Sequence, residues 1–297
     1  MDQSTLVFQR HRARLLGIAY RMLGTLGDAE DVLHDAWLRL QAHNLEELED
    51  PEGWLITVTS RLSLDRLRRA KAEREHYVGP WLPEPLAPES DQPELVHERD
   101  ESLSLTFLLL LERLSPDERA AFLLHDVFEY SHGEAAKILG IADDACRQRA
   151  HRAKVRLRDG RPRFEVDAAV HSRLLNRFID AMARPSLETL RALFAEDAVH
   201  ISDGGGIVRA SLHPLRGADR LARLYLQIAR HLPPATRYEV GTLNGLPAVL
   251  WLEQGVVTGA MWIDTDGVKI TAIHSLRHPG KLAKLAPVVP SRILGPK

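Results

Sequence analysis

The chain has 297 residues, a formal net charge of -2 at pH 7 and one cysteine, Cys146. This length accommodates about two or three domains, and a single cysteine excludes internal disulfides and multi-cysteine metal sites. The sequence shows no CxxC, HExxH or P-loop pattern, no signal peptide and no hydrophobic run long enough for a membrane helix. We therefore expect a soluble cytoplasmic protein without a cofactor, a metal or a membrane partner.

The near-neutral net charge conceals clusters of basic residues. Residues 1–165 contain 23 Lys and Arg against 30 Asp and Glu, whereas residues 166–297 contain 16 against 11. Eight of the 17 residues from Arg147 to Arg163 are basic, and so are six of the 14 from Arg61 to Arg74. Basic stripes of this kind bind polyanions, so nucleic acid is an expected partner.

The first part of the chain is predicted to be helical. In "DAEDVLHDAWLRL" an apolar stripe of Val32, Ala36 and Leu40 lies opposite a row of acids. A second helix is expected to begin with Asp50 as N-cap and Pro51 in the first turn. We expect its apolar face to contain Trp54, Val58 and Leu62, with Leu55 beside them. The second half of this helix is basic.

A proline-rich, acidic linker follows. Five prolines lie between Gly79 and Asp100, a density that excludes a regular helix and favours an extended path. The linker is unusual because Trp81, Leu82 and Leu86 are unfavourable in water. They are expected to pack against another part of the chain.

The next block has the pattern of a helix-turn-helix motif. Capping boxes at Ser115 with Glu118 and at Ser131 with Glu134 mark helix starts, and a turn at Gly140 to Ala142 separates a short helix from a longer one. In the longer helix a buried stripe is expected, formed by Cys146, Ala150, Ala153 and Leu157. The polar side chains left outside would reach base edges and phosphates; the alternative is a merely solvated basic helix. These are Arg147, Gln148, Arg149, His151, Arg152, Lys154 and Arg156.

After Pro162 the pattern changes from helices to strands. Amphipathic helices are predicted at 166–183 and 217–232, and β-rich runs at 248–252, 256–263 and 269–276. Helices followed by antiparallel strands favour an α+β domain with a curved sheet wrapped against helices.

Two helical blocks in this order resemble an extracytoplasmic-function sigma factor of the sigma-70 family. "GDAEDVLHDAWLRL" is similar to region 2.2, "WLITVTSRLSLDRLRRAKAERE" to regions 2.3 and 2.4, and "LSPDERAAFLLHDVFEYSHGEAAKILGIADDACRQRAHRAKVRLR" to region 4. The resemblance implies a protein that binds core RNA polymerase and reads the -10 and -35 promoter elements. It also implies that the exposed residues of the longer region 4 helix contact the -35 element.

The resemblance places further residues in two surfaces. The surface for the β′ clamp helices of the polymerase, whose β flap would receive region 4, comprises Asp28, Glu30, Asp31, His34, Asp35 and Leu38. The surface for the -10 element comprises Asn44, Glu49, Arg61, Asp65, Arg66, Arg68 and Arg69. The alternative is an ordinary amphipathic helix and a polar connecting loop.

The last third resembles the SigJ-like group, whose members carry a fused SnoaL-like domain with a cystatin-like α+β roll. The marks are "WLPEPL", "DGGG" and "HPGKL"; the last departs from the Asn-Pro-Asp-Lys-Leu usual in the group. The fold expected is thus multidomain, with two all-α sigma domains and an α+β roll. The expected ranges are region 2 (1–76), linker (77–102), region 4 (103–163), SnoaL-like domain (166–290) and tail (291–297).

The glycines after Asp203 could form a phosphate loop, an active-site wall or a turn. The β-prone "IVRAS" that follows them gives no helix start, which excludes a phosphate loop. We expect the fused domain to regulate the chain in place of a separate anti-sigma protein, through packing of this rim on the linker. The residues of this contact are Trp81, Leu82, Pro83, Glu84, Pro85, Leu86, Asp203, Gly204, Gly205, Gly206, His278, Pro279, Lys281 and Leu282.

A catalytic fused domain is the alternative function. His200, Asp203, Trp251, Trp262 and His274 could line a cavity of the roll that holds an unknown small ligand. Nothing in the sequence brings a nucleophile, a base and an orienting partner together, so no enzyme activity is expected.

Overall fold

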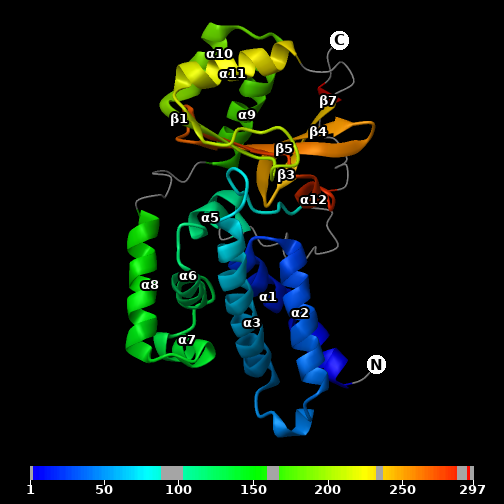
Figure 1. Cartoon of the computed structure of the whole chain (residues 1–297), viewed down its shortest axis with the longest axis vertical. Coiled ribbons are helices and arrows are strands. Elements are labelled where there is room, and N and C mark those ends of the chain that lie inside the picture. The colour runs from blue at the N-terminus through cyan, green and yellow to red at the C-terminus, as the bar shows by residue number, and fades with distance from the viewer. Residues whose placement is uncertain (1–2, 88–102, 159–166, 232–236, 286–292, 295–297) are drawn as a thin grey trace. The chain divides into compact units, whose positions relative to one another are not determined.

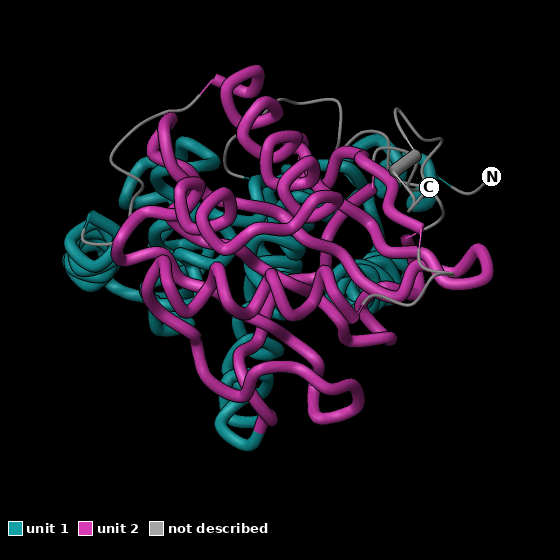
Figure 2. Tube along the Cα trace, turned by 90° about the horizontal axis from the view of Figure 1, so that it is seen from above, with its two compact units in different colours: residues 1–76, 92–161 teal, residues 77–91, 162–297 magenta. Residues whose placement is uncertain are grey.

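The computed structural model describes residues 3–87, 103–158, 167–231, 237–285 and 293–294 (Figure 1). The chain divides into two compact units (Figure 2). The first consists of residues 1–76 and 92–161, and the second of residues 77–91 and 162–297. The "WLPEPL" segment therefore belongs to the second unit. Residues 88–102 of the predicted linker, and all of the predicted tail except 293–294, lie outside the described residues.

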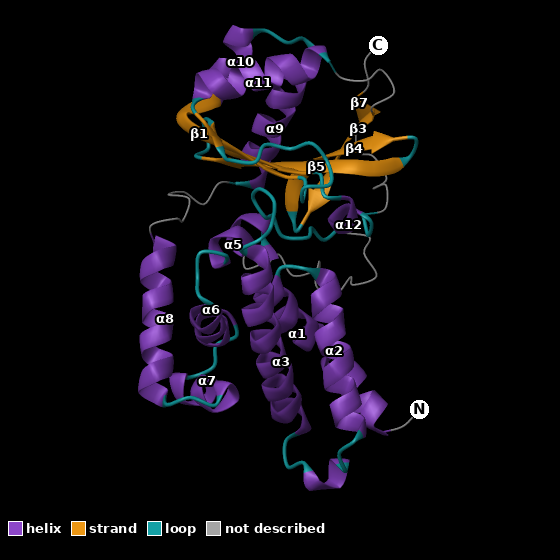
Figure 3. Ribbon diagram, viewed as in Figure 1, coloured by secondary structure: helices purple, strands orange, loops and turns teal. Residues whose placement is uncertain are grey.

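Among its described residues the first unit contains helices and connecting loops but no strand (Figure 3). Its elements are α1 (Gln3–Leu23), α2 (Leu26–Gln41), η1 (Leu45–Glu47), α3 (Pro51–Arg74), α5 (Leu105–Leu111), α6 (Pro116–Phe122), the π-helical turn η3 (Leu123–Val127), α7 (His132–Leu139) and α8 (Asp143–Arg158). Helix α3 begins as predicted, because the Asp50 side chain accepts a hydrogen bond from the Gly53 amide at 3.0 Å and Pro51 opens the first turn.

The apolar face predicted for α3 was wrong except for Leu55, which is buried. Trp54, Val58 and Leu62 are only half-buried. The buried residues are Leu55, Ile56, Thr59, Ser60, Ser63, Leu64, Leu67 and Ala70. Helix α3 contacts α1 and α2 and also α6 and α7. A helix with neighbours on more than one side buries small Ser and Thr side chains, which hydrophobic periodicity does not mark.

The helix-turn-helix forms where its signals predict it. Both capping boxes are present, at Ser115 with Glu118 and at Ser131 with Glu134. Gly140 ends α7 in the left-handed conformation, with φ of 68°, which favours glycine. The predicted stripe of α8 is buried, and its members are Cys146, Ala150, Ala153 and Leu157.

The second unit is a mixed α+β domain. Its elements are α9 (Ala168–Ala183), α10 (Leu187–Leu193), β1 (Phe194–Asp203), β2 (Leu215–Arg216), α11 (Ala218–Arg230), β3 (Arg237–Leu243), β4 (Leu246–Glu253), β5 (Val256–Thr265), β6 (Ile270–Leu276), α12 (Pro279–Leu282) and β7 (Ile293–Leu294). The described strands form one sheet in the order β2-β1-β6-β5-β4-β3-β7, with only β1 and β6 parallel.

The two faces of this sheet have different coverings. Helices α9, α10 and α11 pack on one face, where Phe178, Tyr225, Met261 and Ile273 form part of the core (Figure 3). Side chains alternate between faces along a strand. Trp262 lies next to Met261 in β5 and therefore points to the opposite face, on which α12 and residues 77–87 lie.

Candidate functional site

The predicted -35 residues lie on the solvent-facing sides of α8. Arg147, Gln148 and His151 are exposed. Arg147 also forms an ion pair with Asp143 one turn earlier, at 3.1 Å. Arg147 and Gln148 lie in the first half of α8 and His151 lies at its middle; the N-terminal part of this helix is the part of a helix-turn-helix that faces base edges.

The other cations of α8 that were predicted to contact DNA form ion pairs with acids from the preceding elements. Arg152 and Arg156 both bind Glu118, whose side chain is buried. Burial alone would raise the pKa of Glu118, but hydrogen bonds from Ser115 and the two arginines lower it. The remaining pairs are Arg149 with Asp117 (3.4 Å) and Lys154 with Asp126 (2.6 Å). Five of the seven predicted residues therefore form ion pairs, although the side chains of Arg152, Lys154 and Arg156 remain exposed.

The residues predicted for the -10 element are only partly brought together. Asn44 caps η1 and Glu49 is exposed in the loop before α3. The others lie along α3, where Arg66 binds Asp28 at 2.6 Å and Arg68 binds Asp65 at 3.1 Å. Arg61 donates to backbone carbonyls of α7. Arg69, like Asp65, is exposed.

An exposed stripe on α2 contains most of the predicted polymerase residues. Asp31 lies one helical turn before both His34 and Asp35, and Leu38 lies one turn after them; Leu38 is 46% exposed. Glu30 is half-buried. An exposed leucine between acids is suited to a basic partner helix with an apolar groove.

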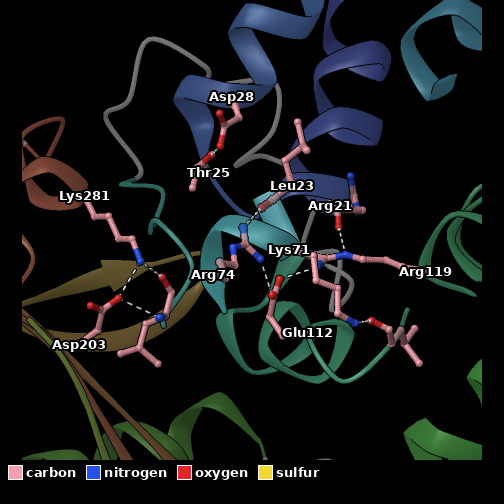
Figure 4. A network of polar contacts seen from close by, with 12 residues as sticks. Arg21, Leu23, Thr25, Asp28, Lys71, Arg74, Glu112, Arg119, Asp203 and Lys281 are labelled. Carbon is pink, nitrogen blue, oxygen red and sulfur yellow. Dashed lines mark hydrogen bonds and ion pairs between the residues drawn. The ribbon is translucent and has the colours of Figure 1, made fainter. Parts of the chain in front are cut away.

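Asp28 is placed differently from the rest of this set. Its side chain binds Thr25 and Arg66, within the same part of the chain (Figure 4). Burial alone would raise the pKa of Asp28, but these hydrogen bonds outweigh it and lower the pKa. Asp28 thus holds the start of α2 against α3, which its position in the sequence does not reveal.

The structure brings the "WLPEPL" segment and the "DGGG" loop together. Asp203, at the end of β1, is fully buried. Its carboxylate accepts hydrogen bonds from the Leu82 amide at 2.9 Å and from the Tyr77 hydroxyl at 2.6 Å. It also accepts one from the Gly205 amide at 3.1 Å. This carboxylate therefore binds a segment more than a hundred residues upstream.

Lys281, in α12, completes this arrangement. Its ammonium group lies 2.7 Å from Asp203 and donates to the Leu82 carbonyl at 2.6 Å (Figure 4). The same group lies 4.2 Å from the centre of the Trp81 ring and 5.2 Å from that of Tyr77. We call Asp203 and Lys281 the Leu82 anchor. The resemblance placed both residues in the regulatory set, whereas Tyr77 was missed.

A second contact holds the other end of the segment. Asn244 Oδ1 accepts from the Leu86 amide at 2.7 Å, and the Asn244 amide donates to the Leu86 carbonyl at 2.9 Å. Asn244 occupies the β3–β4 turn with φ of 49°, a conformation that Asn tolerates well. The Asn-Gly pair indicates a hairpin turn, but its long-range partner leaves no local signal. Between the two anchors Leu82, Pro83, Glu84, Pro85 and Leu86 are buried.

The three glycines are explained by close contacts. A Cβ on Gly204 would lie 2.2 Å from the Val208 carbonyl oxygen, and one on Gly205 would lie 2.1 Å from the His278 ring. A Cβ on Gly206 would meet Val78 at 3.0 Å. As expected, no helix begins after the glycines. Residues 207–211 form a turn and loop, closed by hydrogen bonds to the Gly204 carbonyl, and polar closure of the turn overrides the β propensity of Ile207.

The five residues expected around a cavity do not share one location. His200 faces the helices, and its Nδ1 lies 3.0 Å from the Tyr225 hydroxyl. Trp251 packs against the same core. Trp262 and His274 are register partners on the other face, where their rings stack and His274 binds Asp264 at 2.9 Å. The sheet separates the two groups, and Asp203 belongs to the Leu82 anchor.

His200 should make the stability of this domain sensitive to acid. Burial, with a contribution from His274, lowers the pKa of His200 to about 4 from 6.5. The unfolded chain therefore binds a proton before the folded one does. The contribution of His200 to the free energy of unfolding is complete above pH 6.5, and this free energy should fall by roughly 3 kcal/mol as the pH approaches 4. Hydrogen exchange of the β1 amides at pH 7 and pH 4.5 measures this loss of stability. The variant His200→Asn should show a much smaller difference in protection between the two pH values. If the variant shows the same difference as wild type, His200 is not the group responsible.

Comparison with known proteins agrees with this geometry. Residues 7–73 match the family described as Sigma-70 region 2, and residues 104–157 match Sigma-70, region 4. Both matched ranges lie in the helical unit. The chain belongs to the extracytoplasmic-function (ECF) RNA polymerase sigma factors of the sigma-70 family.

Three relatives describe the extent of this similarity. The chain is 37% identical to the ECF RNA polymerase sigma factor SigJ of Mycobacterium tuberculosis over 231 residues, which are 76% of this chain and 73% of SigJ. It is 33% identical to the probable sigma factor SigI of the same species, over 96% of both chains. The crystal structure of M. tuberculosis SigJ aligns with a TM-score of 0.75 at 30% identity, covering 94% of this chain and 98% of that one.

The predicted fold class is thereby confirmed: helical sigma regions are followed by an α+β domain. Among the described helices, none combines the length and apolar character needed to cross a bilayer.

Proposed function

We propose that this sigma factor binds core RNA polymerase in the cytoplasm through the exposed stripe of α2. We further propose that it reads promoter DNA with α3 and α8. The observation that carries the proposal is the geometry of α8, an exposed basic helix that follows a left-handed glycine turn and packs its other side into the unit. Among the predicted residues, Gln148 and His151 are suited to base edges and the acid-paired cations to phosphates.

The ion pairs of α8 support a division of roles. Glu118 and Asp117 keep Arg149, Arg152 and Arg156 close to the body of the unit, where they can meet the DNA backbone on either side of a groove. Arg147 has its charge balanced only by Asp143 on the same helix among the contacts described. It can exchange that exposed partner for a guanine edge at little cost.

Replacing Arg147 with Ala should weaken binding at one base position. A lost bidentate base contact costs about 1–3 kcal/mol, or roughly tenfold to a hundredfold in affinity. Run-off transcription with M. tuberculosis core polymerase on a promoter library randomised at the -35 element would show relaxed preference at that position. Arg158→Ala, at the far end of the same helix, is the control: it should weaken all sequences alike. Equal preference profiles for wild type and Arg147→Ala would contradict the proposed base contact.

The fused domain is proposed to regulate transcription through the two anchors of residues 77–87. Residues 77–87 directly follow α3 and form the first part of the chain that joins region 2 to region 4. Their attachment to the α+β domain therefore fixes the start of this connecting chain. Two anchors only a few residues apart hold residues 82–86 on the α+β domain. A change in the anchors would therefore change the arrangements available to the two DNA-reading regions.

The alternative of an enzyme domain has less support. A catalytic site needs its acid, base and orienting groups around one substrate position. The candidate residues are divided between the two faces of the sheet, as described above. We therefore propose a binding and regulatory domain, without a substrate.

A further inference from the structure

The solvent-facing side of α11, in the α+β domain, carries a row of arginines. Figure 1 draws this helix in yellow, within the helical layer of the domain. One side of α11 packs into the core and consists of Ala218, Leu221, Ala222 and Tyr225. The opposite side is exposed and consists of Arg220, Arg223, Gln227, Arg230 and the following His231. Spacings of three and four residues place these polar side chains in one stripe along the helix.

No acidic side chain compensates the charge of this row. The one acid in the sequence of α11, Asp219, lies in the first turn and binds Arg191 of α10 at 2.5 Å. Within the described part of the chain, no carboxylate lies within ion-pair distance of Arg220, Arg223 or Arg230. The exposed side of a helix normally mixes charges of both signs, so a row of one sign indicates a partner of the opposite sign.

The groups of the row are suited to phosphate. A guanidinium group stays charged at any physiological pH, and its fork of N–H donors binds phosphate oxygens in pairs. Gln227, in the middle of the row, adds neutral donors for the same oxygens. The His231 side chain donates from Nδ1 to the Gln227 carbonyl at 2.9 Å and so holds the last turn of the helix. Because the three arginines are exposed and lack described partners, binding of a phosphate breaks no ion pair of the domain.

The length of the row favours nucleic acid over protein as the partner. Arg220 and Arg230 are ten residues apart, which is about 15 Å along the helix axis at about 1.5 Å per residue. Double-stranded DNA carries one negative charge per about 1.7 Å of its axis, so cations anywhere along such a row meet phosphates. The surface of a folded protein intersperses charges of both signs and offers few rows of acids of this length.

We propose that the exposed side of α11, formed by Arg220, Arg223, Gln227 and Arg230, is a docking surface for the backbone of double-stranded DNA. The surface binds phosphates and reads no bases, so it adds affinity without sequence preference. The fused domain thereby becomes a third DNA-binding part of the chain, beside α3 and α8. This inference rests on the proposal that the chain meets promoter DNA, and it adds a contact that the proposed function does not include.

Two full-length variants compare this row with an equal charge elsewhere on the same domain. The α11 variant is Arg220→Gln, Arg223→Gln, Arg230→Gln. The matched control removes three exposed cations from α9 and its C-cap and is Arg173→Gln, Arg177→Gln, Arg184→Gln. Asp180 lies one turn from both Arg177 and Arg184, so the α9 row already contains an acid. A third variant keeps the charge and has Lys at the three α11 positions.

The first measurement is the salt dependence of binding to a fluorescein-labelled, mixed-sequence DNA duplex of about 40 base pairs. Each lost phosphate contact lowers the slope of log K against log salt by about 0.9, so the α11 variant should lose about 2 to 3. The α9 control should keep the wild-type slope to within about 1, and the Lys variant should keep most of it. An unchanged slope in the α11 variant, or equal losses in the α11 and α9 variants, would overturn the proposal.

Cross-linking separates this inference from the proposed function. In a Cys146→Ala background, a photoactivatable label is attached at Gln227→Cys in the α11 row or at Val155→Cys in α8, where Val155 is 48% exposed. The full chain is bound to core polymerase on DNA selected from the promoter library, without nucleotides. A cross-link from Gln227→Cys to DNA supports the proposal. A cross-link only to a polymerase subunit, which would assign an acidic protein partner, or no cross-link, overturns it. Failure of Val155→Cys to cross-link DNA would contradict the proposed role of α8 instead.

Discussion

Replacing Asp203 with Ala is expected to release residues 77–87 from the α+β domain. The change leaves the buried ammonium group of Lys281 without its carboxylate and removes the acceptor of the Leu82 amide and the Tyr77 hydroxyl. Breaking a buried ion pair on one side costs about 3–5 kcal/mol. Hydrogen exchange at Leu82 measures the local opening free energy, which should fall by about that amount.

A double-mutant cycle distinguishes a broken ion pair from a general loss of packing. Lys281→Ala alone should also be destabilising, because it leaves the Asp203 carboxylate buried without its cation. The double variant should be less destabilised than the sum of the two, since no unpaired charge remains. Additive effects would show that the pair contributes nothing beyond its separate contacts. Ser186→Ala, in the cap of α10, is a control that should leave Leu82 protected.

Replacing Glu112 with Ala is expected to have an effect of similar size in the helical unit. Glu112 accepts from both Arg74 and Arg119, and Arg119 is almost completely buried. Removal of the carboxylate leaves that guanidinium without its counter-ion, at a cost of about 3–5 kcal/mol. Protection of α6 amides against exchange should fall accordingly. Glu112→Gln retains the volume and one acceptor oxygen but not the charge, so it should lose nearly as much protection as Glu112→Ala; a clearly smaller loss would contradict an electrostatic origin.

The same network predicts how this unit responds to pH. Burial alone would raise the pKa of Glu112, but Arg119 and Arg74 outweigh it and hold the pKa below the ordinary value of 4.5. The unfolded chain therefore takes up the proton first. The contribution of Glu112 to the free energy of unfolding is complete above pH 4.5. It is lost as the pH falls through the lower pKa that Glu112 has in the folded protein. Protection of α6 in Glu112→Gln should not show this loss.

Local signals in the sequence were sufficient for the helices and turns. The Ser115 and Ser131 capping boxes, the Asp50 cap and Gly140 depend on residues within a few positions of each other, so their geometry could be predicted. The failures arose where a segment has distant neighbours. The buried face of α3 depends on its contacts with α6 and α7, which lie far away in the sequence.

The residues that anchor the "WLPEPL" segment could also be predicted only in part. The resemblance brought Asp203 and Lys281 into one set, although no pattern within the sequence links them. Asn244 and Tyr77, which complete the anchors, were not found, because a polar residue in a turn or loop is common and its partner lies far away in the sequence. The role of Arg119 was missed for a related reason: an arginine in an amphipathic helix is expected to be exposed, and only the tertiary structure shows its burial.

The central claim is that this ECF sigma factor is regulated by the attachment of residues 77–87 to its fused domain. The most direct measurement is run-off transcription with core polymerase on a randomised promoter library, comparing wild type, Asp203→Ala, Lys281→Ala and the double variant. We expect transcript from the wild type and a change of about fivefold or more in the single variants. Unchanged output from a variant whose Leu82 amide has lost its protection would contradict the claim.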